Sequence, residues 1–89
     1  MKEITINCCA FLSRSDLHRV IADALAFPNH YGSNLDALHD CLTEIAEETI
    51  ISLANWKDAE EKLGTYAHSA RRTILDAANE NTNLAIIFD

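Results

Sequence analysis

Residues 49–54, TIISLA, form the stretch that decides the fold. Four of the six residues are apolar, and the stretch lacks the alternation of polar and apolar residues that marks a strand with one wet face. Such a run is typical of a strand that is covered on both faces or lies centrally in a parallel sheet. We therefore predict a buried strand here and place the other elements around it.

Two more strands are predicted near the ends of the chain. Residues 3–8, EITINC, alternate in polarity and place Ile4, Ile6 and Cys8 on one side. Residues 84–88, LAIIF, form a short apolar run that predicts a third buried strand. All three strands are therefore separated by long intervening segments.

The first intervening segment predicts two helices. Ser13 or Ser15 caps the first, and Pro28 stops it, because a residue before proline is pushed toward extended geometry. Ser33 or Asn34 caps the second helix, after a loop with the sequence FPNHYGSN. The first helix has an apolar stripe at helical spacing: Leu17, Val20, Ile21, Ala24 and Leu25. The stripe of the second is Leu35, Leu38, Leu42 and Ile45.

The second intervening segment also predicts two helices. Asn55 caps a short helix, WKDAEEKL, which Gly64 ends. Thr65 caps a longer helix that runs to about Asn79. Its inward positions are predicted to be Ala67, Ala70, Ile74, Leu75 and Ala78.

The predicted order is strand, helix, helix, strand, helix, helix, strand. Strands joined by long helical crossovers are parallel, and the crossovers are right-handed. We therefore expect an α/β fold with a three-stranded parallel sheet and four helices, built as a single domain over residues 1–89. The second helix can pack on the sheet or on a neighbouring helix.

Charge and cysteine content narrow the function. The formal net charge is −7, which disfavours binding to nucleic acid or to anionic membranes, since phosphate contacts need lysine and arginine. Three cysteines, Cys8, Cys9 and Cys41, suit no disulfide framework, and neither a signal peptide nor a membrane span is recognisable. A cytoplasmic protein is expected, with no metal or cofactor because metal-ligand spacings are absent.

The acidic residues are concentrated where cations are missing. Residues 20–56 contain no lysine or arginine and six acids: Asp23, Asp36, Asp40, Glu44, Glu47 and Glu48. At about 100° per residue, the polar face of the second helix carries Asp36, Asp40, Thr43 and Glu47. Like-charge pairs one turn apart would cost roughly 1 kcal/mol in total. The face favours a docking site for a positive partner, with a merely solubilising surface as the alternative.

Catalytic interpretations are weaker. His39 stands beside Asp36 and Asp40, so it could be partly protonated and could orient the acids, or it is simply an exposed helix histidine. His39, Asp40 and Cys41 are residue types of a thiol enzyme, but adjacent helix positions do not face each other. We expect no enzyme activity.

Residues 15–44, SDLHRVIADALAFPNHYGSNLDALHDCLTE, resemble the barstar family of intracellular ribonuclease inhibitors. The resemblance rests on SDLH, on LAFP, and on the YG-NLDAL-DCLT pattern, all in order and correctly spaced, and it thins after Glu48. It implies the fold predicted above. It also implies that the second helix and the loop before it plug the active site of a nuclease, with carboxylates in the places of substrate phosphates.

The resemblance carries the phosphate-mimicking role onto Asp36 and Asp40. It implies further contact or loop-shaping positions: Tyr31, Gly32, Asn34, Ala37, Thr43 and, on the last helix, Asp76. The chain departs from the family at three positions. The resemblance implies aromatic residues in the family where this chain has His30 and His39, and another aromatic residue near Ile45. We also include His30, His39 and Glu47 in the predicted partner-binding surface, and we expect Gly32 to supply an unusual backbone angle.

The expected function is that of an immunity protein, or antitoxin. Its partner would be a basic secreted or toxin ribonuclease, held by a monomeric inhibitor in a 1:1 complex. The alternative is a barstar-like adaptor that binds a different basic protein.

Overall fold

Three parallel strands form one sheet in the order β1-β2-β3, with β2 in the centre. The computed structural model describes residues 1–89. The strands are β1 (Lys2–Asn7), β2 (Thr49–Ala54) and β3 (Leu84–Phe88). The helices are η1 (Cys8–Ala10, a 3₁₀ turn), α1 (Arg14–Leu25), α2 (Leu35–Thr43), α3 (Trp56–Leu63) and α4 (Thr65–Glu80). The predicted α/β fold and its element order are confirmed.

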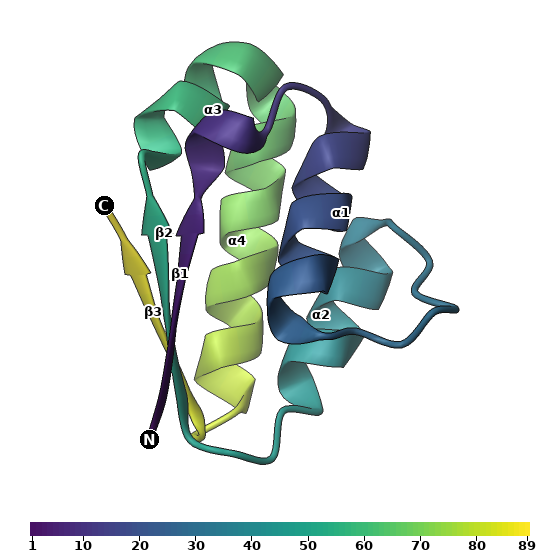
Figure 1. Ribbon diagram of the computed structural model, residues 1–89, viewed down its shortest axis with the longest axis vertical. Helices are drawn as coiled ribbons and strands as arrows, with labels where there is room; N and C mark the ends of the chain where they lie inside the picture. The colour runs from purple at the N-terminus through teal and green to yellow at the C-terminus, as the bar shows by residue number, and fades with distance from the viewer.

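The sheet is covered on one face only. Figure 1 shows α1, α2 and α4 on the same side of the sheet, with α3 at the end where β1 and β2 finish. Ile51 and Leu53 of β2 are buried under these helices, whereas Ile50 is half-buried on the other face. Of the two alternatives predicted for β2, the central position is confirmed, whereas cover on both faces is not, because only alternate residues are buried. β3 is not fully buried either, because its Ile87 is 50% exposed on the open face.

Local capping was predicted in part. Ser13 caps α1 through a 3.1 Å hydrogen bond from the Asp16 amide, and Asn34 caps α2. Asn55 is the N-cap residue of α3, as predicted, but its side chain makes no capping hydrogen bond. The prediction for Thr65 is wrong, because Gly64 holds the N-cap position of α4.

Two helix features also differ from expectation. α1 ends at Leu25 because Ala26 takes a left-handed conformation (φ 54°), ahead of the stop expected at Pro28. In α4, Ala77 faces the core in place of the predicted Leu75, which is 39% exposed.

Helix α2 packs mainly on α4, and its inward side also faces the sheet across the core. Its inward residues, Leu38 and Leu42, are buried in the core, and the side chain of Asn81, just after α4, closes the lower end of α2. The Asn81 amide nitrogen donates to the carbonyls of Leu42 (3.0 Å) and Ile45 (2.9 Å). One buried side chain therefore joins the end of α4 to the end of α2.

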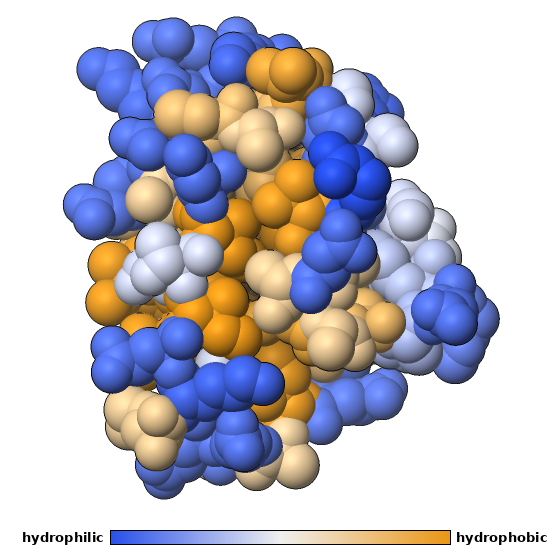
Figure 2. Space-filling model, in the orientation of Figure 1, coloured by the Kyte–Doolittle hydropathy of each residue, from blue (hydrophilic) through white to orange (hydrophobic).

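The core reaches the surface between the sheet edge and α1. Figure 2 shows apolar residues gathered in a band down the middle of the face that Figure 1 presents, bordered by hydrophilic residues. Ile4 of β1 and Val20 and Leu25 of α1 are half-buried residues that pack against the core at this edge. None of the helices combines the length and apolar character needed to cross a membrane.

We predict that Asn81→Ala destabilises the fold by about 2 kcal/mol, because buried carbonyls lose their donor and cannot reach water. Urea unfolding of both variants measures the effect against Thr82→Ala, a change at the exposed neighbouring residue. Equal losses from Asn81→Ala and Thr82→Ala would show that the amide bridge contributes nothing.

Candidate functional site

Asp36 and Asp40 lie one turn apart on the outer side of α2, opposite the buried Leu38 and Leu42. Both aspartates are exposed, and 76% of the Asp40 side chain is open to solvent. No lysine or arginine forms an ion pair with either one. The structure therefore presents two carboxylates on a short, well-anchored helix.

Glu47 does not belong to that helix face, which corrects the prediction from helical spacing. α2 ends at Thr43, and Glu47 lies in the irregular segment that leads to β2. The carbonyls at the end of α2 bond to Asn81, so the chain leaves the helix there. Glu47 instead borders a separate hollow with Lys2 and Ile4 at the start of β1.

The loop before α2 lies against the same helix face. A shallow hollow of ≈ 220 Å³ brings loop residues to the side of Asp40. Its predicted site residues are His30, Tyr31, Gly32, Ala37 and Asp40. Asn34 and Asp36 line a neighbouring groove, and Thr43 donates its hydroxyl hydrogen bond to the Asp40 carbonyl (2.9 Å). Loop and helix thus form one continuous surface.

Gly32 serves this surface through its size. Its φ is not positive, whereas Ser33 takes the left-handed conformation (φ 51°), so the predicted reason for the glycine is wrong. A Cβ at Gly32 would lie 3.1 Å from the Asn34 amide nitrogen and 3.4 Å from the Ala37 Cβ. A side chain at this position would therefore crowd the Asn34 side chain, which would have to move by a few tenths of an ångström.

The capping residue Asn34 links the same parts. Its side-chain oxygen accepts from the Ala37 amide (2.8 Å), and its side-chain nitrogen donates to the Gly32 carbonyl (3.2 Å). One side chain thereby holds both the loop and the start of α2, which gives Asn34 a loop-shaping role.

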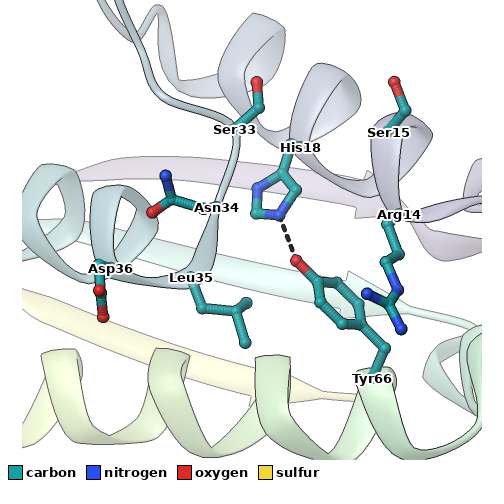
Figure 3. A pocket seen from close by; sticks show the side chains of 8 residues that line it. All are labelled: Arg14, Ser15, His18, Ser33, Asn34, Leu35, Asp36 and Tyr66. Atoms are coloured by element: carbon teal, nitrogen blue, oxygen red, sulfur yellow. Dashed lines mark hydrogen bonds between the residues drawn. The ribbon is translucent and has the colours of Figure 1, made fainter.

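A buried histidine supports the loop from behind, which the sequence did not indicate. His18 of α1 is 1% exposed, and its Nδ1 and Nε2 each lie 2.6 Å from a tyrosine hydroxyl, those of Tyr31 and Tyr66. Figure 3 shows His18 reaching toward Tyr66 between α1 and α4. The Tyr31 hydroxyl therefore forms its hydrogen bond within the protein. The centroids of the Tyr31 and Phe27 rings lie 5.0 Å apart.

Burial shifts the pKa values in this arrangement. Desolvation lowers the pKa of His18 and raises those of Tyr31 and Tyr66. All three groups are thus held in their neutral forms, in which one imidazole nitrogen can donate and the other accept.

The open side of this arrangement is a polar groove of ≈ 610 Å³ between the starts of α1 and α2. Figure 3 shows its lining: the Arg14 guanidinium at the Tyr66 ring, the hydroxyls of Ser15 and Ser33, and Asp36 at the far side. Arg14 is thus engaged with an aromatic ring and leaves Asp36 unpaired.

His39 joins α2 to α4 at the other end of the surface. Its Nε2 lies 2.5 Å from Glu80 Oε2, and its Nδ1 lies 3.7 Å from Asp40 Oδ1. Sequence reasoning placed His39 beside the aspartates but missed Glu80, which is 41 residues away. Asp76 is exposed one turn before Glu80 on α4, so the acidic surface spans two helices.

Cys41 is half-buried beside these acids. Burial, with smaller contributions from Glu44 and Asp40, raises the pKa of its thiol, which disfavours the thiolate that a nucleophile needs. No group of three histidine, cysteine, aspartate or glutamate side chains is arranged to hold a metal ion.

Comparison with known proteins identifies the family of this chain. The family model described as "Barstar (barnase inhibitor)" matches residues 1–88. The chain belongs to the barstar family. A Bacillus subtilis (strain 168) protein named "Putative ribonuclease inhibitor YrdF" is 37% identical over 81 residues, which cover 90% of this chain and 89% of that protein. The barstar resemblance noted in the sequence is therefore confirmed over residues 1–88.

We predict that His18 makes the stability of this barstar-family domain depend on pH. Its pKa is lower in the folded protein than its ordinary value of about 6.5, so the unfolded chain binds the proton more tightly. The free energy of unfolding should fall as the pH drops below about 6.5 and level off below the folded pKa. Urea titrations between pH 5 and 8 measure it.

The variant His18→Gln should lose this component of the pH dependence, whereas His68→Gln, on the exposed face of α4, should keep it. An unchanged pH profile in His18→Gln would contradict the assignment, because the remaining acids and histidines would then account for the whole dependence.

Proposed function

We propose that this protein inhibits a basic ribonuclease by inserting α2 and the preceding loop into the active site of the enzyme. The observation that carries the proposal is the pair Asp36 and Asp40, exposed one turn apart without any lysine or arginine partner. The ribonuclease partner also fits the family description and the printed name of the B. subtilis relative.

The charge arrangement suits a cationic active site. An RNA-cleaving site must attract phosphate groups, so it presents arginine, lysine and protonated histidine side chains. Two carboxylates one turn apart can occupy the places of successive phosphates and accept charge-assisted hydrogen bonds. With a net charge of −7, the protein also attracts such an enzyme over a distance and speeds association at low salt.

The supporting contacts make this surface ready to bind. Asn34 and Gly32 fix the loop to the helix, and the His18 hydrogen bond holds Tyr31 in place. A loop that is ordered before binding loses less conformational entropy in the complex. Ala37 and the small hollow beside Asp40 leave space for a side chain of the enzyme.

The details of the partner follow from the same surface. We propose a 1:1 complex in which the inhibitor acts inside the cell that carries it, as an immunity protein against a secreted or toxin ribonuclease. An interface of ordinary size would bury about 800 Å² on each protein. His30 lies beside Asp40 in the loop hollow and Asp76 is exposed on α4, and we propose that both touch the rim of the enzyme.

Inhibition can be tested by titrating the purified protein against barnase and other basic bacterial ribonucleases while RNA cleavage is followed by fluorescence. We expect stoichiometric inhibition of at least one of them. If none is inhibited while the fold is intact, the proposal fails, and a basic partner other than a nuclease becomes the better explanation of the acidic surface.

We predict that Asp40→Ala weakens inhibition by about 100-fold or more, because a charged group of the enzyme would be left buried without its partner. Glu61→Ala, which removes an exposed carboxylate of α3, should change inhibition little. Inhibition constants and circular dichroism of both variants provide the comparison. Equal effects from the two changes would remove Asp40 from the binding surface.

A further inference from the structure

His39 is the one histidine that forms ion pairs with acids of α2 and α4, those of Asp40 and Glu80. Its imidazole lies between Glu80 of α4 and Asp40 of α2, at 2.5 Å and 3.7 Å. The other ion pairs in the protein, Arg19–Asp16 and His68–Glu60, lie elsewhere. The charge on this surface therefore depends on whether His39 carries a proton.

The groups around His39 are all acidic. On α2, Asp40 is adjacent to His39, and Asp36 lies one turn before His39. On α4, which packs against α2, Glu80 contacts His39, and Asp76 lies one turn before Glu80. The hydrogen bond to Glu80 is the main cause that raises the pKa of His39, desolvation opposes it, and Asp40 adds to the rise.

The imidazole is also accessible to a partner. Its side chain is 31% exposed, and those of Asp40 and Glu80 are 76% and 60% exposed. A cation that docks on Asp40 would arrive close to the imidazole ring. If the ring were charged, the two positive groups would compete for the same carboxylate and repel each other.

We propose that His39 is a proton-dependent specificity residue, which occupies Asp40 and Glu80 as their own cation and gives up its proton when a cationic partner binds to them. The inference rests on the proposed function, since it concerns the same acidic surface. In the free inhibitor, the protonated His39 neutralises part of the negative charge of Asp40 and Glu80. The proton then passes from the imidazole to the buffer as the complex forms.

The proposal fixes the direction in which affinity for the partner changes with pH. Because binding favours the neutral imidazole, affinity for the partner should increase as the pH rises through the pKa of His39, which lies above its ordinary value of about 6.5. A single linked proton changes the dissociation constant by at most about tenfold per pH unit. In the free protein the sign is opposite, since the protonated His39 stabilises the fold and this contribution is lost at higher pH.

Two measurements test the inference. In the free protein, NMR titration of the His39 ring signals should give a pKa above the ordinary histidine value of about 6.5, and Glu80→Gln should lower it. In the complex with the ribonuclease of the panel that is inhibited most tightly, calorimetry in buffers of different ionisation enthalpy should show proton release above that of the His39→Gln variant.

Subtracting the number of protons released with His39→Gln corrects for protons that the enzyme itself gains or loses on binding. His68→Gln serves as the matched control and should release as many protons as the unchanged protein. Tight binding with the same proton count and the same pH profile in His39→Gln would overturn the inference and leave the inhibitor function standing. Absence of binding to every ribonuclease would overturn the proposed function, and the inference with it.

Discussion

Leu38 and Leu42 bury one side of α2 in the core, and the outward direction of Asp36 and Asp40 follows from that packing. Burying a leucine side chain contributes about 1.5–3 kcal/mol, so the two together exceed the roughly 1 kcal/mol expected from repulsion between neighbouring acids. The helix can therefore carry an unpaired acidic face. Asn81 adds a second attachment at the end of α2, where the last helical carbonyls would otherwise lack a donor.

The loop before α2 depends on a different contact. His18 comes from α1 and holds Tyr31 of the loop, while its other nitrogen bonds to Tyr66 of α4. A polar group this deeply buried is costly unless both of its nitrogens are satisfied, and here both are. The same arrangement that satisfies His18 thus fixes the loop, and stability of the core and readiness of the binding surface are connected.

The acidic surface is a compromise between stability and binding. If α2 and α4 carried only acids along their shared edge, the free protein would bear the full repulsion. His39 relieves it through Glu80 and Asp40, without placing a permanent positive charge where a basic partner would dock.

The sequence alone determined the features that depend on neighbours along the chain. Three local patterns predicted the sheet, the second helix and the start of that helix: the apolar run of β2, the apolar stripe of α2 and the Asn34 cap. Each of them depends on residues that lie within about four positions of one another. Tertiary structure decided where α2 ends and which partners His18 and His39 have. These depend on residues up to 48 positions apart, and no local pattern records which distant side chain the packing brings within hydrogen-bond distance.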